Sequence, residues 1–190
     1  MKKELGVHPY VFPMPVLLIA TYNEDGSVNV MNMAWGGACG NEYVALNIDD
    51  DHKTAINILN RKAFTLAIAD LPHIKEADFF GIATGNTMKD KFERSGLHAV
   101  KSSRVDAPII EEFPVTLECE YAGRDEHDFC NRYLGKIVNV LADEKVLDEK
   151  GKVDASKLQA LVFDQFRNDY YVVGEKVGTA WKTGVPLMKK

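Results

Sequence analysis

Residues 15–35 read PVLLIATYNEDGSVNVMNMAW and predict the first two strands of an antiparallel sheet. Residues 15–22 are rich in branched apolar side chains, which favour strands, and the Asp25-Gly26 pair suits a tight hairpin turn. Residues 28–35 are then the returning strand. Because side chains of a strand alternate between its two faces, Val30 and Asn32 are expected on the face opposite to Met31.

Further strands are predicted along the chain from runs of branched and aromatic residues, at 43–48, 64–69, 114–121, 133–141 and 170–173. Apolar residues at helical spacing predict helices over 54–60, 73–83, 89–95 and 156–163. No repeat, low-complexity segment or linker divides the chain, so residues 1–190 are expected to form a single domain. Many short strands with a few inserted helices indicate a mainly β fold, a closed or nearly closed barrel.

Charge and hydropathy argue against two classes of partner. The chain has 23 basic and 28 acidic residues, a net charge of -5, and no basic stripe of the kind that a nucleic acid backbone requires. Its longest apolar stretch, residues 16–20, is far too short to cross a bilayer, and no apolar segment follows the charged start. We therefore expect a cytoplasmic protein that contacts neither nucleic acid nor membrane.

The cysteines give no strong metal motif. Cys39, Cys119 and Cys130 are widely spaced, and the default for each in a reducing compartment is a free thiol. Cys119, His127 and Cys130 could together bind zinc, but they lack the two close-set pairs that zinc sites usually have. No metal site is predicted.

Several common enzyme motifs are absent from the sequence. There is no Gly-x-Gly-x-x-Gly turn, no Gly-x-Ser-x-Gly elbow and no His-Glu-x-x-His helix. Residues 81–89 are not a phosphate-binding P-loop, because Lys89 stands four residues after Gly85 instead of next to it. The sequence therefore gives no support to a hydrolase or a Rossmann-type dehydrogenase.

One predicted strand ends in an unusual way. Residues 32–37 read NMAWGG, a tryptophan followed by two glycines that let another backbone or a ligand approach closely. A planar aromatic ligand would suit this segment. The alternative is an ordinary core tryptophan followed by a turn.

Two other segments could hold an anion. Residues 52–54 follow a predicted strand and begin a helix, so free N–H groups, a hydroxyl and an ammonium meet there. The three aspartates at 49–51 favour the alternative of a helix cap with solvated charges. The second segment is the polar loop at 84–87, which leads to Lys91; alternatively, Lys91 only solvates a helix face.

The order of six segments resembles a known family. Residues 13–16, 29–35, 52–54, 90–92, 117–119 and 135–138 follow one another as they do in the flavin reductase-like, FMN-binding split-barrel proteins, and most closely as in the flavoredoxin-type branch. The resemblance covers about residues 13–184 and implies a six-stranded antiparallel split β-barrel of Greek-key topology. It further implies a homodimer in which each subunit binds one FMN near the interface.

The resemblance also implies a role for particular positions. Four residues at the strand end would line the flavin ring and ribityl chain: Asn32, Met33, Ala34 and Trp35. Six others would hold the phosphate: His52, Lys53, Thr54, Thr84, Gly85 and Lys91. The aspartate run is a departure, because many relatives have a basic residue near the position of His52.

The implied activity is that of an oxidoreductase passing electrons from NAD(P)H or a protein donor through the flavin to a small acceptor or a protein partner. Hydride transfer to a flavin needs no protein nucleophile, so no catalytic residue is predicted. The alternative is a non-catalytic electron carrier, flavoredoxin-like, without a nicotinamide site of its own. A pyridoxal-type phosphate oxidase on a related barrel is less favoured, because basic phosphate ligands are sparse.

Overall fold

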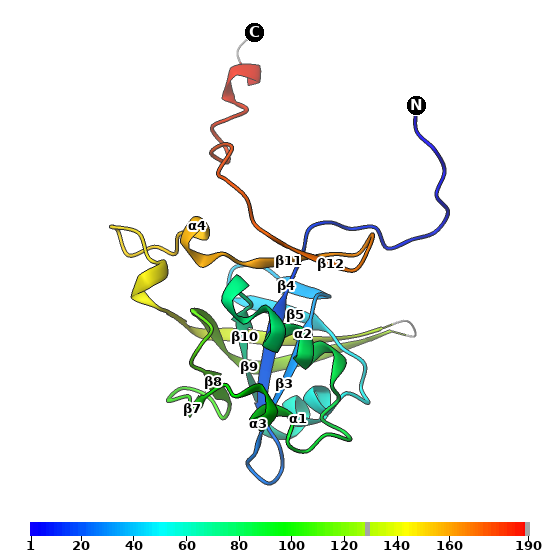
Figure 1. The fold of residues 1–190 in the computed structure, drawn as a ribbon, viewed down its shortest axis with the longest axis vertical. Coiled ribbons are helices and arrows are strands. Elements are labelled where there is room, and N and C mark those ends of the chain that lie inside the picture. The colour runs from blue at the N-terminus through cyan, green and yellow to red at the C-terminus, as the bar shows by residue number, and fades with distance from the viewer. Residues whose placement is uncertain (128–129, 189–190) are drawn as a thin grey trace.

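The computed structural model describes residues 1–127 and 130–188, and most of its regular structure is antiparallel sheet (Figure 1). The main sheet has seven strands in the order β3-β2-β6-β9-β10-β5-β4. Its strands are β2 (Leu17–Tyr22), β3 (Val28–Met33), β4 (Gly36–Ala38), β5 (Tyr43–Asn47), β6 (Ala63–Ile68), β9 (Val115–His127) and β10 (Cys130–Ala142). The sheet curls into a split barrel, which confirms the predicted fold class; the seventh strand, β4, is a short addition after Trp35.

The predicted first hairpin is confirmed. Leu17 pairs with Met33 and Tyr22 with Val28, and the turn is closed by the Asn23 N–H, which donates to the Ser27 carbonyl at 2.8 Å. Gly26 has φ 85°, a left-handed conformation that favours glycine. The alternation along this hairpin buries both of its faces, and each face belongs to a different core.

The two cores lie on opposite faces of the sheet. The outer core joins the hairpin to α2 (Ile74–Ile82) and α3 (Lys91–Ser95), and its members include Leu18, Val30, Phe80 and Phe92. The inner core fills the barrel, with Ile19, Met33, Leu46, Phe64 and Tyr133 among its members. Asn32 shares the outer face with Val30, as predicted, and its Nδ2 donates to the Ala77 carbonyl of α2 at 2.8 Å.

Gly135 of β10 is required by the packing of the barrel. A Cβ atom at this position would lie 2.3 Å from Cζ of Phe64, a fully buried ring of the inner core. We expect Gly135→Ala to lower the free energy of unfolding by about 1–3 kcal/mol, because overpacking forces neighbouring groups out of place. Urea unfolding would measure the loss. Gly174→Ala, where the added Cβ meets nothing within 4 Å, is the control, and equal stability of both variants would contradict the argument.

The remaining elements surround the main sheet. There are four α-helices in the described residues, α1 (Lys53–Arg61), α2, α3 and α4 (Ala155–Leu158). Three short 3-10 turns are also present: η1 (Leu71–His73) before α2, η2 (Glu144–Val146) before α4, and η3 (Val185–Met188) after β12. Strands β7 (Ala99–Lys101) and β8 (Pro108–Ile110) form a separate pair. A three-stranded sheet contains β1 (Met14–Pro15), β11 (Leu161–Asp164) and β12 (Asp169–Val172).

One predicted helix is wrong. The apolar spacing over 156–163 predicts a single helix, but α4 ends at Leu158, and Gln159 has a left-handed φ of 49°. The following residues form β11, in which Val162 pairs with Pro15 and Phe163 with Met14. Pairing between distant segments therefore outweighs the local helical pattern.

The two terminal segments leave the same side of the molecule, beside β11 and β12 (Figure 1). In the described part of the chain, no helix is long and apolar enough to cross a membrane.

Candidate functional site

Three neighbouring cavities meet at Asn32. The first, of about 140 Å³, lies between the start of α1 and the loop after α2, and we call it the small cavity. The second, of about 380 Å³, lies between the end of β3 and the loop after β5, and we call it the strand-end cavity. The third, of about 250 Å³, reaches Phe163 and Tyr170. Asn32 lines all three, and His52 lines the first two, so distant sequence segments share one site.

All ten predicted site residues line these cavities. The small cavity is lined by Asn32 and by the whole predicted phosphate set, His52, Lys53, Thr54, Thr84, Gly85 and Lys91. The third cavity is lined by Asn32, Met33, Ala34 and Trp35. The cavities also bring in residues that the sequence analysis did not single out as ligands, among them Asn29 in the small cavity and Asn47 in the strand-end cavity.

Lys91 is a buried cation. Lys91 is the first residue of α3 and is only 4% exposed. Its Nζ donates to the Phe80 carbonyl at 2.9 Å. No carboxylate within residues 1–127 or 130–188 forms an ion pair with it. Burial lowers the pKa of Lys91 to about 8. The interpretation of Lys91 as a solvated helix-face residue is therefore wrong, and the cavity wall contains an ammonium that lacks a counter-charge.

Thr54 is held by a buried amide. Asn29 Nδ2 donates to Thr54 Oγ1 at 2.9 Å, and both residues are buried. Because that hydroxyl oxygen already accepts a hydrogen bond, its own proton remains available to a ligand. Asn57 extends the network, since its Nδ2 donates to Thr21 Oγ1 at 3.1 Å. Asn29 Nδ2 also lies 3.5 Å from Thr21 Oγ1, so the network holds Asn29 and Thr54 in place at the cavity.

The start of α1 adds backbone donors to the same cavity. A helix leaves its first N–H groups without intrahelical partners. No side chain caps α1, whose N-cap residue is His52. The first turn, with Lys53 and Thr54 on it, can therefore offer N–H groups to an anion together with the two side chains.

The loop after α2 closes the small cavity from the other side. A Cβ atom at Gly85 would lie 2.3 Å from Asn29 Oδ1 and 3.3 Å from Lys53 Cγ, so only glycine fits without movement. Asn86 Nδ2 donates to the Asp51 carbonyl at 2.9 Å and ties this loop to the one before α1. The hydrogen bond thus holds together two loops that are separate in sequence, and both loops enclose the small cavity.

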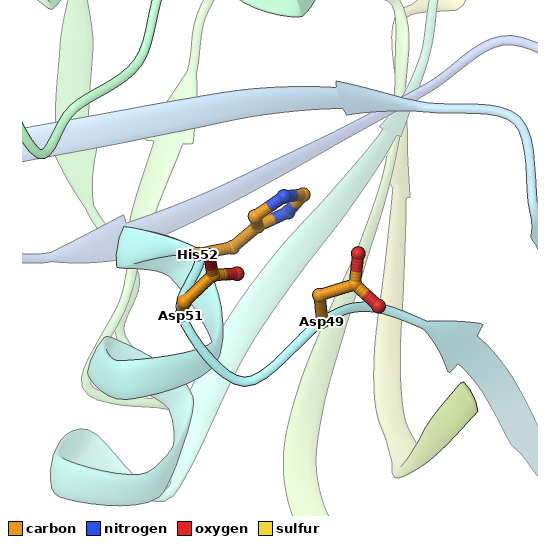
Figure 2. Close-up of side chains that lie close together, drawn as sticks. All are labelled: Asp49, Asp51 and His52. Carbon is orange, nitrogen blue, oxygen red and sulfur yellow. The ribbon is translucent and has the colours of Figure 1, made fainter. Parts of the chain in front are cut away.

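The aspartate run is only partly free. The Asp50 carboxylate accepts hydrogen bonds from the Tyr133 hydroxyl and from Arg124, the latter at 2.9 Å. Asp50 is therefore paired and not free to bind a ligand. Figure 2 shows Asp49, Asp51 and His52 close together on the loop before α1, and their ligand atoms lie within 4.8 Å of one another. All three are exposed, as acidic groups often are without an ion, and we assign no metal to them.

The zinc interpretation fails on register. Cys119 pairs with Ile137, whereas Cys130 pairs with His127 at the far end of the same hairpin. Eight residue steps of extended strand lead from Cys119 to His127, a span of about 26 Å. These residues cannot share one ion.

Trp35 forms a flat wall beside the strand-end cavity. The residue is 48% exposed, and its ring centroid lies 6.3 Å from that of Phe163. The alternative interpretation, a core tryptophan, is therefore wrong. Asn47 lines the same cavity, and its Oδ1 is buried and receives no hydrogen bond from any described residue. An aromatic ligand with a ring N–H would satisfy that oxygen.

Tyr170 borders the third cavity. Its hydroxyl donates to Asp78 Oδ1 at 3.0 Å, and burial, together with that carboxylate, raises the pKa of Tyr170 to about 12. Tyr170 therefore stays protonated at neutral pH and holds β12 against α2.

Fold and site together define a split barrel suited to a phosphorylated aromatic ligand: cationic and hydroxyl donors surround the small cavity, and a tryptophan lines the neighbouring one. The family model described as "Flavin reductase like domain" matches residues 10–168. The chain belongs to that family.

Solved structures agree with this assignment. Flavoredoxin of Desulfovibrio vulgaris (Miyazaki F) is 34% identical, with a TM-score of 0.92, over 97% of this chain and 100% of that chain. Flavoredoxin from Methanosarcina acetivorans is 25% identical, with a TM-score of 0.86, over 99% and 98%. An FMN-binding protein from Thermus thermophilus, 17% identical over 94% and 98%, has a TM-score of 0.76 and shows the shared fold. Family and neighbours support FMN as the cofactor, and the buried Lys91 ammonium, the Thr54 hydroxyl and the Gly85 enclosure fit its phosphate.

Proposed function

We propose that this chain is an FMN-dependent oxidoreductase that takes electrons from NAD(P)H or a protein donor and passes them to a small acceptor or a protein partner. The observation that carries the proposal is the buried Lys91 ammonium, which no carboxylate of the described residues pairs with. It lies on a cavity that shares Asn32 and His52 with the cavity of Trp35. Bound FMN would supply the electron transfer itself. The residues of the chain supply binding and orientation.

In this proposal the small cavity holds the phosphate. Lys53 and Lys91 contribute charge, Thr54 and Thr84 contribute hydroxyl donors, and the first turn of α1 contributes N–H groups. A phosphate carries about -1.5 to -2 charges at pH 7 and would supply the counter-charge that Lys91 lacks. Asn29 acts as a positioning residue, because it orients the Thr54 hydroxyl.

The ring of FMN is assigned to the strand-end side of the site. Met33, Ala34 and Trp35 follow the strand that Asn32 anchors to α2, so their positions are fixed by the sheet. The buried Asn47 Oδ1 would accept from the ring N–H. No side chain is assigned a nucleophilic or general-base role.

A visible absorption spectrum tests the proposal. The purified protein, after incubation with FMN and removal of the excess, is expected to show flavin bands, with the released cofactor identified as FMN. A protein that stays colourless after this treatment would refute the proposed function.

The second candidate is an electron carrier without a nicotinamide site. It is favoured by the relatives named flavoredoxin, at 34% and 25% identity, and by the absence of a dinucleotide motif in the sequence. Anaerobic mixing of the FMN-loaded protein with NADH and NADPH separates the two. Rapid bleaching with either nucleotide supports the reductase, and no bleaching supports the carrier.

We further propose a homodimer in the cytoplasm. Several large aromatic side chains are exposed in the single chain, among them Phe166, Tyr171 and Trp181, and a second copy could cover them. Trp35, at the candidate ring site, is half exposed as well. Light scattering at micromolar concentration is expected to give the mass of two chains, and a monomer would count against a site at an interface.

FMN affinity is expected to depend on Lys91 titration. The pKa of Lys91 is lowered to about 8, so the free protein loses this cation as the pH rises through that value. The FMN phosphate, with a second pKa near 6, keeps its charge over the same range. Above pH 8, binding must then take up a proton, and the Kd should rise by up to about tenfold per pH unit.

The stability of the FMN-free protein should change in the opposite sense. A lowered lysine pKa means that the buried ammonium opposes folding below pH 8, and this opposition fades as the pH rises from 8 toward 10.5. Fluorescence titration with FMN from pH 7 to 9.5 and urea unfolding would measure both effects. Lys91→Met should remove both, and an unchanged pH profile in that variant would show that another group titrates.

A further inference from the structure

The C-terminal tail, residues 174–188, carries apolar side chains that are exposed. Trp181 is 97% exposed and Leu187 is 91% exposed. Figure 1 shows the tail running away from the barrel after β12, so its own barrel gives these side chains no cover. Large apolar side chains exposed together on one short segment make that segment a candidate interaction surface.

The tail nevertheless has a defined local structure. The Thr183 hydroxyl donates to the Thr179 carbonyl at 2.9 Å, and residues Val185–Met188 form the 3-10 turn η3. Trp181 has φ 60°, a left-handed conformation that is uncommon for a residue with a large side chain. Such a conformation is usually held by surrounding contacts, which the described residues do not provide in one chain.

A fourth cavity lies on the side from which the tail leaves. It has a volume of about 600 Å³ and lies between the N-terminal segment and β4, and we call it the arm cavity. Pro9, Val11 and Pro13 of the N-terminal segment line it, together with Trp35 and Cys39. Gln165 Oε1 is buried in its lining, and none of residues 1–127 or 130–188 donates a hydrogen bond to it. Asn47, whose Oδ1 is also buried without a described donor, and Arg132 line the same cavity. The cavity therefore suits a mainly apolar group that carries an N–H donor.

Charge favours contact between the tail and the rest of the protein. Residues 174–190 contain four lysines and one glutamate, a net charge of +3. Because the whole chain has a net charge of -5, the other 173 residues have a net charge of -8. Opposite net charges steer two surfaces together and disfavour pairing of barrel with barrel alone.

We propose that the tail of one copy docks in the arm cavity of a second copy, with the Trp181 indole inside and its N–H donating to Gln165 Oε1. The tail and the arm cavity lie on the same side of the molecule. A two-fold axis on that side would let each copy place its tail in the arm cavity of the other. The inference rests on the homodimer of the proposed function and names the segment that builds it. Because Trp35 lines both the arm cavity and the strand-end cavity, the docked tail would also support Trp35 from behind.

A disulfide trap tests the docking. Ala180 is exposed and precedes Trp181, and Cys39 is a free, exposed thiol in the arm cavity lining. We expect mild oxidation of Ala180→Cys to give a covalent dimer, with the new cysteine joined to Cys39 of the other chain in peptide mapping. Ser103→Cys, an exposed position between β7 and β8, and the unaltered protein are the controls, and both should stay largely monomeric on a non-reducing gel.

The outcomes separate the alternatives. A bond between the new cysteine and Cys39 within one chain would overturn the exchange in favour of a tail that folds back, and no bond to Cys39 would overturn the docking. In light scattering, Trp181→Ala should raise the dimer dissociation constant at least tenfold, and Trp181→Phe should retain part of the affinity. FMN binding by the unaltered protein is measured separately, so a yellow protein with an undocked tail refutes this inference and leaves the proposed function intact.

Discussion

Replacing the two cavity lysines together, Lys53→Ala with Lys91→Met, is expected to weaken FMN binding by about 10²–10⁴-fold. Each charged hydrogen bond to a phosphate contributes about 1.5–3 kcal/mol, so losing two removes about 3–6 kcal/mol. Methionine keeps most of the length of the Lys91 side chain beside Phe80, so the buried packing is largely preserved. Quenching of FMN fluorescence on titration with protein measures the Kd.

Riboflavin provides the matched control for the double variant. It has the ring and ribityl chain of FMN but no phosphate, so the unaltered and double-variant proteins should bind it with similar affinity. Lys75→Ala, an exposed lysine of α2, should leave FMN binding unchanged. Equal FMN affinity in the double variant and the unaltered protein would reject the phosphate assignment, and equal loss of riboflavin would point to a damaged fold.

Gly85→Ala is expected to reduce FMN affinity by tenfold or more and to destabilise the protein. The added Cβ would lie 2.3 Å from Asn29 Oδ1, so Asn29 must move or the loop must open. Movement of Asn29 releases Thr54, and an opened loop widens the small cavity. Overpacking of this kind costs about 1–3 kcal/mol. FMN titration and thermal unfolding of the FMN-free protein measure the two effects.

Gly81→Ala is the control for Gly85→Ala. It shows whether an effect comes from the close contact at Gly85 or from replacing any glycine in this region. There the added Cβ would lie 3.6 Å from Asn32 Cβ, an ordinary contact, and the position is inside α2. Alanine should therefore stabilise the helix by about 0.5–1 kcal/mol. A Gly85→Ala variant as stable as Gly81→Ala would contradict the enclosure described for the small cavity.

Local pattern is enough to predict the first hairpin and most of the barrel. The Asp25-Gly26 turn and the alternation on either side determine register within a few residues, and the structure follows them. The prediction for residues 161–164 is wrong for the opposite reason. Their apolar spacing fits a helix, but they form a strand that pairs with Met14 and Pro15 and with the strand that follows. Met14 and Pro15 lie far outside any local window of the sequence, so the local pattern gives no signal for that pairing.

The site is predictable in part. Sequence order is enough to nominate Lys53, Thr54 and Lys91, and the structure brings them to one cavity. Burial of Lys91 and the Asn29–Thr54 bond depend on how α3 and α1 meet β3, so a single sequence gives no signal for them. Asn47 is likewise an ordinary strand residue until β10 and the loop after β3 surround it.

A crystal structure of the FMN complex tests the central claim most directly. The account predicts that the phosphate contacts Lys53, Thr54 and Lys91 in the small cavity and that the flavin ring extends past Asn32 toward Trp35. A phosphate bound elsewhere, with Lys91 still donating only to the Phe80 carbonyl, would contradict it.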